Sequence, residues 1–235
     1  MTVPLEAVIF DWAGTLTPWV PFEPEGEWRA LAEALGPPDL EVTVKALADA
    51  ADVVWARVRS DHSSATFDEI CALAGVTPTE AAVERYRAHW EPATFTDPDV
   101  PELVRGLHER GIRAGVLSNT VWPRAWHEAV FERDGVGDLF DGAVYSSEIP
   151  WVKPHPEAFA AARKAVGVDD PAACVFVGDR LFEDIYGAQN AGMRAVLVPH
   201  SDIPTGQRGP AEGEPDAVVQ RLRDVLTVVD RWRPD

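Results

Sequence analysis

The stretch that decides the fold is a short apolar run near the start of the chain that ends in an acid. From Ala7 to Thr17 it reads Ala-Val-Ile-Phe-Asp-Trp-Ala-Gly-Thr-Leu-Thr. Such a run before a glycine-containing turn is typical of a strand buried on both faces of a parallel sheet. Asp11 would then emerge at the carboxyl end of the strand, the edge where open α/β sheets bind ligands. The plainer alternative is a strand and a turn, with Asp11, Gly14 and Thr15 as turn formers.

Composition narrows the functional class. The chain has 235 residues, of which 46% are hydrophobic, so it can bury a sizeable core. A net charge of −18 argues against nucleic acid and anionic membranes as partners, because phosphate contacts need clustered Lys and Arg. A phosphorylated substrate would therefore need a local reversal of this negative field. The sequence has no run of 18 apolar residues, and its start lacks a charged region followed by an apolar one. We therefore expect neither a membrane span nor a secretion signal.

The two cysteines, Cys71 and Cys174, form no disulfide framework and no zinc-binding spacing. Cys174 lies within an apolar run, where a free thiol behaves as a small buried hydrophobe. This usage fits a reducing cytoplasm.

A block with only helical periodicity follows the first strand. From about Glu27 to Glu91 the apolar residues recur at helical intervals, and Thr77-Pro78-Thr79-Glu80 predicts a helix start with Thr77 as its cap. Proline-rich loops, Pro18 to Pro24 and Pro92 to Pro98, flank the block. We therefore predict an all-helical cap over residues 18–95, inserted into a core formed by residues 1–17 and 96–235.

Strands and helices alternate from Asp97 onward, which predicts an α/β fold with a doubly wound, Rossmann-like parallel sheet. The expected strands are 112–117, 142–145, 174–177 and 194–198. Expected helices are 100–110, 122–132, one after Pro154, 183–191 and 216–232, and residues 200–214 are expected to form a loop.

Polar residues follow the predicted strands and gather at one edge of the sheet. In chain order they are Asp11 and Thr15, Ser118 and Asn119, Lys153, and Asp179 with Asp184. In this order and spacing they resemble the four motifs of the haloacid dehalogenase superfamily of hydrolases. The resemblance spans nearly the whole chain, including a helical cap after the first strand. These motifs are specific for the superfamily but carry little information about the substrate.

The resemblance implies a hydrolase that uses Mg²⁺ and a covalent aspartyl intermediate. A carboxylate at Asp11 can attack phosphorus and divide one hard displacement into two easier ones. Mg²⁺ prefers oxygen ligands. The positions that match the metal ligands of the family are Asp11, the backbone carbonyl of Ala13, Asp179 and Asp184.

The remaining motif residues match groups that bind the substrate. Lys153 would neutralise the nucleophile and the transferring group. Thr15, Ser118 and the backbone around Gly14 would donate to phosphoryl oxygens, with Asn119 beside them. The chain has three lysines against eighteen arginines, so a lysine at this position is less often a coincidence. The alternative for each is a surface or helix-capping role.

One position departs from the pattern of the family. Most phosphatases of the superfamily carry a second Asp two residues after the nucleophile, which protonates the leaving oxygen. This chain has Ala13 there. General acid catalysis contributes about 10²- to 10⁴-fold, so an alkyl phosphate would be a poor substrate unless another group, such as His62 or His89 in the cap, supplies the proton.

Four functional interpretations remain. The favoured one is a phosphatase of a small phosphorylated metabolite. Asp-Trp-Ala-Gly-Thr also looks like the first motif of phosphonoacetaldehyde hydrolase, which would cleave a carbon–phosphorus bond with an imine-forming cap lysine, here Lys45. The other two are a 2-haloacid dehalogenase and a protein that binds a phosphorylated ligand without turnover. A homodimer is compatible with the sequence.

Aromatic residues lie beside the motifs. Trp12, Trp19, Trp122 and Trp151 each adjoin or lie close to a motif residue. Packing is the default role of such residues, and the alternative is an aromatic wall that selects a planar or apolar leaving group.

Overall fold

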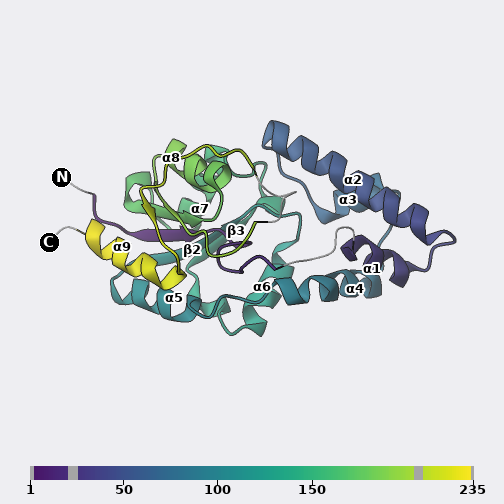
Figure 1. Ribbon diagram of the computed structural model, residues 1–235, viewed down its shortest axis with the longest axis horizontal. Coiled ribbons are helices and arrows are strands. Elements are labelled where there is room, and N and C mark those ends of the chain that lie inside the picture. The colour runs from purple at the N-terminus through teal and green to yellow at the C-terminus, as the bar shows by residue number, and fades with distance from the viewer. Residues whose placement is uncertain (1–2, 21–25, 204–208, 234–235) are drawn as a thin grey trace.

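The computed structural model describes residues 3–20, 26–203 and 209–233, and its centre is a parallel sheet of six strands. Their spatial order is β3-β2-β1-β4-β5-β6, which confirms the predicted doubly wound α/β fold (Figure 1). The strands are β1 (Ala7–Phe10), β2 (Arg113–Ser118), β3 (Gly142–Tyr145), β4 (Cys174–Gly178), β5 (Arg194–Leu197) and β6 (Ala217–Val218).

The chain order reverses beside β1. From β1 the chain builds outward to β2 and β3, and then returns to place β4 on the other side of β1. Phe10 pairs with Val116 on one side and with Val177 on the other. In doubly wound sheets, a ligand crevice opens at the carboxyl ends of the strands where the order reverses. The fold therefore sets the residues that follow β1 and β4 side by side.

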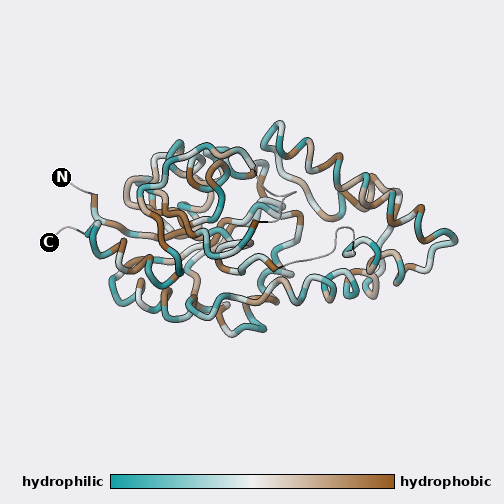
Figure 2. The backbone as a smooth tube through the Cα atoms, in the orientation of Figure 1, coloured by the Kyte–Doolittle hydropathy of each residue, from teal (hydrophilic) through white to brown (hydrophobic). Residues whose placement is uncertain are grey.

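Helices cover both faces of the sheet (Figure 1). On one face lie α5 (Val100–Glu109) and α9 (Val225–Trp232), and on the other α7 (Pro156–Ala165) and α8 (Gly187–Asn190), while α6 (Arg124–Arg133) follows β2. The apolar strands of the sheet lie between these layers (Figure 2). All four residues of β1 are fully buried, with Val8 and Phe10 in one apolar cluster and Ala7 and Ile9 in the other.

The predicted helical block forms a separate group of helices. They are α1 (Gly26–Leu35), α2 (Leu40–Asp61), α3 (Phe67–Leu73) and α4 (Glu80–Trp90), followed by the short turn η1 (Glu91–Ala93). None of residues 26–95, all of which are described, adds a strand to the sheet. Part of the predicted entry loop, residues 21–25, lies outside the described residues. Where the chain returns, Asp97 N donates to Leu16 O at 2.8 Å, so the outgoing and returning segments lie together.

Short 3₁₀ turns connect several elements of the core. They are η2 (Gly137–Leu139), η3 (Ser146–Glu148), η4 (Pro171–Ala173) and η7 (Leu222–Asp224).

Three local predictions were wrong in detail. The cap of α4 is Thr79, whose Oγ1 accepts from Ala82 N at 3.3 Å, and Thr77 precedes the helix. The predicted helix 183–191 begins earlier, as a π-helical turn, η5 (Leu181–Tyr186), that continues into α8. Of the predicted helix 216–232, only the last part, α9, is an α-helix. The start of this segment forms a strand instead, because Ala217 and Val218 pair with the open edge of β5.

Two further observations concern the remaining expectations. Residues 204–208 of the predicted loop 200–214 lie outside the described residues. Among the residues that the structure describes, no helix is both long enough and apolar enough to cross a membrane.

The burial of His127 predicts that the stability of the protein depends on pH. Its ring stacks on Tyr145 with centroids 4.4 Å apart and meets the Trp12 ring edge-on at 4.5 Å. Burial, with a smaller contribution from the charge of Arg124, lowers the pKa of His127 from 6.5 to about 3. Between these two values the unfolded chain binds a proton that the folded chain does not bind, so stability falls as the pH falls.

We expect the free energy of unfolding to decrease below pH 6.5, by up to about 1.4 kcal/mol per pH unit from this group. His127→Phe keeps the ring stack but removes the titrating group, so its pH dependence should be shallower. Urea unfolding at pH 7.5, 6.5 and 5.5 measures both slopes, with His108→Gln at an exposed histidine as the control. Equal slopes for wild type and His127→Phe would contradict the prediction.

Candidate active site

The predicted motif residues meet at the carboxyl edge of the sheet. Asp11 directly follows β1, Ser118 ends β2, and Asp179 directly follows β4. Lys153 lies in the loop before α7, and Asp184 lies within η5. Asp11 N donates to Val177 O at 2.9 Å, which continues the ladder between β1 and β4 to the site itself.

Lys153 lies between two acids of the site and contacts both. Its Nζ lies 2.5 Å from Asp11 Oδ1 and 2.8 Å from Asp184 Oδ1, and its side chain is 2% exposed. Burial by itself would lower the pKa of this ammonium group, but the charges of Asp11 and Asp184 outweigh it and raise the pKa. Lys153 is therefore a fixed, buried cation beside the predicted nucleophile.

Asn119 holds the backbone of Lys153. Lys153 N donates to Asn119 Oδ1 at 2.8 Å, and Asn119 Nδ2 donates to Lys153 O at 2.9 Å. Asn119 was predicted to bind the substrate, but both ends of its amide are engaged with this backbone. Its contacts in the structure position Lys153, and direct binding of the substrate by Asn119 stays a prediction.

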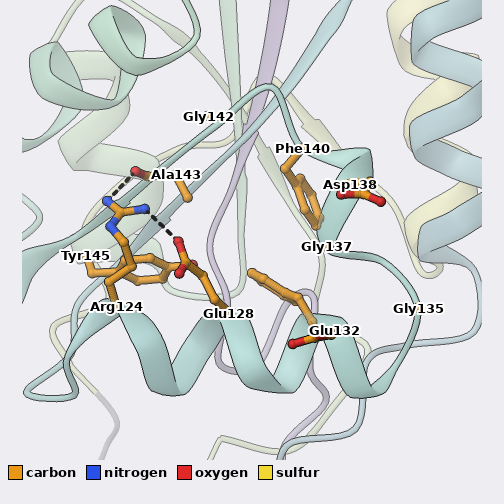
Figure 3. Close-up of a pocket in the computed structure, with 11 residues that line it drawn as sticks. Arg124, Glu128, Glu132, Gly135, Gly137, Asp138, Phe140, Gly142, Ala143 and Tyr145 are labelled. Atoms are coloured by element: carbon orange, nitrogen blue, oxygen red, sulfur yellow. Dashed lines mark hydrogen bonds and ion pairs between the residues drawn. The ribbon is translucent and has the colours of Figure 1, made fainter.

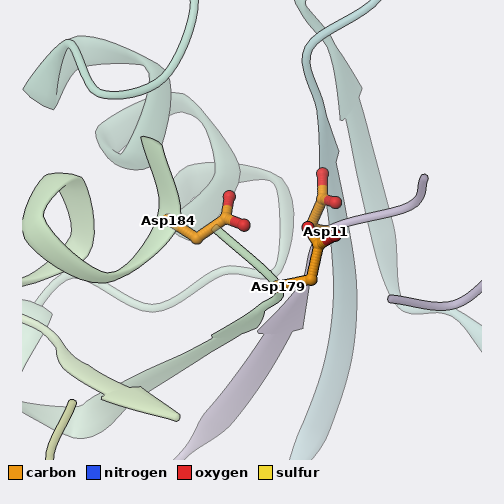
Figure 4. Close-up of side chains that lie close together, drawn as sticks. All are labelled: Asp11, Asp179 and Asp184. Carbon is orange, nitrogen blue, oxygen red and sulfur yellow. The ribbon is translucent and has the colours of Figure 1, made fainter. Parts of the chain in front are cut away.

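Asp11, Asp179 and Asp184 form a compact buried cluster (Figure 4). One carboxylate oxygen from each lies within 4.8 Å of the others. Burial, opposed by Lys153 and reinforced by the charge of Asp184, raises the pKa of Asp11 to about 6. Burial together with the charges of Asp11 and Asp184 raises the pKa of Asp179 to about 8. The fold thus holds negative charges close together in a place where water compensates them poorly.

This cluster fits a small divalent cation. Asp179 Oδ1 is buried, and it has no hydrogen-bond partner within the described part of the chain. Lys153 contacts two of the three carboxylates, and the charge of Arg180 lowers the pKa of Asp11 and of Asp179 without offsetting burial. A cation would add positive charge to this cluster and find there the oxygen ligands that Mg²⁺ prefers. Ala13, predicted to offer its carbonyl, lies in a tight turn closed by Gly14 N donating to Thr17 O at 2.7 Å. Its role as a ligand stays a prediction.

The predicted donors to phosphate lie at the carboxyl ends of β1 and β2. Thr15 is buried, and its Oγ1 has no partner among the described residues. Ser118 is also buried. Gly14 has a φ of +96°, and a Cβ at this position would collide with both the Asp179 carboxylate and the Trp19 indole. Glycine is therefore required at this turn, where the backbone approaches the carboxylates closely.

The cap residues named from the sequence lie in different surroundings. Lys45 is 74% exposed and forms an ion pair with Asp49, one helical turn along α2. His89 packs against Gly26 at the start of α1. His62 ends α2, and its carbonyl accepts from Val152 N at 2.9 Å, so it lies beside the loop that carries Lys153.

The four tryptophans do not form one wall. Trp12 and Trp122 are buried and pack together with centroids 5.7 Å apart, and Trp151 stacks on His155 at 4.0 Å. Trp19 differs, because its Nε1 donates to Asp179 Oδ2 at 2.7 Å. The sequence singles out Trp19 as a residue near a motif but does not predict this contact, because no spacing rule links a loop tryptophan to an acid 160 residues away.

A separate pocket of about 570 Å³ lies between α6 and the edge strand β3 (Figure 3). Arg124 Nη2 donates to Ala143 O at 3.0 Å and lies 2.7 Å from Glu148 Oε2. The lining also includes the acids Glu128, Glu132 and Asp138 and none of the cluster carboxylates. Its acidic character is unsuited to a phosphate, so it is not a second candidate for the active site.

Comparison with known proteins identifies the family of the chain. Residues 5–192 match the family model described as haloacid dehalogenase-like hydrolase. A glyceraldehyde 3-phosphate phosphatase of Methanopyrus kandleri is 33% identical over 138 residues, 59% of this chain and 58% of that protein. A phosphonoacetaldehyde hydrolase of Bordetella avium is 30% identical over 201 residues, 76% of this chain and 66% of that protein. The chain thus spans between a half and two thirds of the length of these curated relatives.

Solved structures share the fold over almost the whole chain. A HAD phosphatase from Thermococcus onnurineus superposes with a TM-score of 0.67 at 21% identity, covering 96% of this chain and 98% of that one. The L-2-haloacid dehalogenase of Xanthobacter autotrophicus gives a TM-score of 0.65 at 21% identity, with the same coverage. With the family model matched over most of its length, the chain belongs to the haloacid dehalogenase-like hydrolases, as the order of its motifs predicted.

Proposed function

We propose that this protein is a Mg²⁺-dependent phosphatase of a small phosphorylated metabolite, acting through a phosphoryl group carried on Asp11. The observation that carries the proposal is the contact of Lys153 Nζ with Asp11 Oδ1, in a site where Asp179 and Asp184 complete a buried acidic cluster. Asp11, Asp179 and Asp184 would hold the cation, with the Ala13 carbonyl as a further ligand. When bound, the cation would supply positive charge to the phosphoryl oxygens.

The chain's own residues account for the two displacements. A carboxylate oxygen of Asp11 attacks phosphorus, and the bond to the leaving oxygen breaks. Water then attacks the same phosphorus, which releases phosphate and restores Asp11. Lys153 stabilises the negative charge of the transferring group, and Thr15 and Ser118 donate to its oxygens. Gly14 allows the backbone of this turn to lie close to the Asp179 carboxylate.

The phosphatase proposal is favoured over the alternatives on structural grounds. The resemblance to phosphonoacetaldehyde hydrolase implies an imine formed on a lysine of the helical block, but Lys45 is exposed and paired with Asp49. Dehalogenation needs no metal, which would leave Asp179 and Asp184 as a costly buried pair without a role. A pure binding protein would have no need of a nucleophile held by a buried lysine. The glyceraldehyde 3-phosphate phosphatases among the relatives also support a small phosphorylated substrate.

Substitution of the nucleophile tests the reaction. Wild type should release phosphate from p-nitrophenyl phosphate and acetyl phosphate with Mg²⁺ and lose this activity with a chelator. Asp11→Asn should abolish turnover, by at least about 10³-fold, because an amide is a poor nucleophile. Asp49→Asn, an exposed acid in the cap, is the matched control and should behave like wild type.

Two outcomes of this assay would contradict the proposal. One is turnover that persists in Asp11→Asn. The other is turnover of phosphonoacetaldehyde that requires Lys45, measured with Lys45→Ala, since it would assign the carbon–phosphorus chemistry instead.

The absence of an acid at Ala13 predicts a strong dependence on the leaving group. Aryl and acyl phosphates should turn over much faster than alkyl phosphates, because their oxygens leave without protonation. Ala13→Asp should raise kcat/KM for an alkyl monoester by about 10-fold or more and change acetyl phosphate hydrolysis little. Equal rates of wild type on alkyl and acyl phosphates would show that another group already supplies the proton.

The acidic cluster also predicts opposite effects of one substitution with and without metal. In chelator at neutral pH, Asp179→Asn should raise the free energy of unfolding by about 1–2 kcal/mol. Burial raises the pKa of Asp179 to about 8, so folding must either bury its charge or take up a proton, and an amide requires neither. Saturating Mg²⁺ should stabilise wild type and not Asp179→Asn. Thermal and urea unfolding, each with EDTA and with Mg²⁺, measure the two effects. Loss of stability in chelator would show that the charge of Asp179 is already compensated.

A further inference from the structure

Trp19 makes a contact that packing alone does not require. Its indole Nε1–H donates to Asp179 Oδ2 at 2.7 Å, a short and direct bond between residues 160 positions apart. The other oxygen of the same carboxylate, Oδ1, is buried and has no partner among the residues the structure describes. The indole thus engages one oxygen of Asp179 and leaves the second available.

Several surrounding groups hold the indole in this place. The Trp19 backbone N–H donates to Ser201 Oγ at 3.1 Å, and Ser201 Oγ lies 3.4 Å from Gly14 O. The Arg180 guanidinium lies over the Trp19 ring, 5.4 Å from its centroid. Gly14 completes the arrangement, because any side chain there would enter the space that the indole and the carboxylate share. The Trp19 ring is therefore held by three contacts: its backbone N–H bonds Ser201, Arg180 covers its face, and its Nε1 bonds Asp179.

We propose that Trp19 is a positioning residue for the metal: its N–H fixes the orientation of Asp179 so that Oδ1 faces the acidic cluster and can bind the cation. This inference rests on the proposed Mg²⁺ site and adds to it a residue that touches neither substrate nor metal. Groups that hydrogen-bond metal ligands orient them, and their loss costs about 10- to 100-fold in metal affinity.

The test is Mg²⁺ affinity, measured by calorimetric titration of the full-length protein with Mg²⁺ alone. Trp19→Phe keeps an aromatic ring and removes the donor, and we expect its Kd for Mg²⁺ to rise by about 10- to 100-fold. Trp122→Phe is the matched control, because it removes an indole donor that bonds Tyr86 Oη at 3.2 Å instead of an acid of the cluster. Its Kd should equal that of wild type.

Thermal unfolding in EDTA separates positioning from packing. A residue that only packs would lower the melting temperature without changing the Kd of the folded protein, whereas Trp19→Phe should change the Kd. If Trp19→Phe does not fold, Ser201→Ala takes its place, because it releases the Trp19 backbone. A weaker Kd in that variant supports the inference, and an unchanged Kd overturns it.

The Mg²⁺ affinities separate the role of Trp19 from the proposed metal site on which it rests. Wild type that binds Mg²⁺, with binding lost in Asp179→Asn and weakened in Trp19→Phe, supports both. Equal affinities of wild type and Trp19→Phe overturn the role of Trp19 and leave the metal site standing. Wild type that binds no Mg²⁺ at millimolar concentration overturns the metal site and the role of Trp19 with it.

Discussion

The interaction on which the site depends is the buried contact of Lys153 with Asp11 and Asp184. Two buried carboxylates and one ammonium group lie within hydrogen-bonding distance, each less than a tenth exposed. Breaking such a contact by removing one partner costs about 3–5 kcal/mol, because it leaves a buried charge uncompensated. The loop before α7, the end of β1 and the turn η5 are therefore held to one another by charge as well as by packing.

The fold supplies the geometry that this contact needs. The chain order reverses beside β1, so the ends of β1 and β4 are neighbours and bring Asp11 and Asp179 together. Asn119, just after β2, then fixes the Lys153 backbone through both ends of its amide. The segment after α2 also contacts this loop, where Ser64 N donates to Pro150 O at 3.0 Å. Both the sheet region and the segment after α2 thus contact the loop that carries the lysine.

The sequence predicted the sheet and the cluster because both follow from local pattern and strand order. The buried run 7–10 predicted β1, and the motif acids at strand ends predicted Asp11 and Asp179 in one site. The π-helical turn at Leu181–Tyr186 and the short strand at Ala217–Val218 were missed, because each depends on a distant partner. Periodicity cannot report an open strand edge or an acid drawn toward a lysine.

Side-chain contacts between distant loops were the least predictable part of the site. Asn119, which was expected at the substrate, holds the Lys153 backbone, and Trp19, which was expected as wall or packing, bonds an acid. Both are polar contacts over long sequence separations, which composition and spacing do not encode. The close approach of the acids also bears on Ala13, because an acid there would add a further carboxyl group near a buried acidic cluster in which Lys153 contacts two of the three carboxylates. Less crowding of charge therefore accompanies the loss of a proton donor, and efficient turnover then needs either a leaving group that departs without protonation or a proton from another residue.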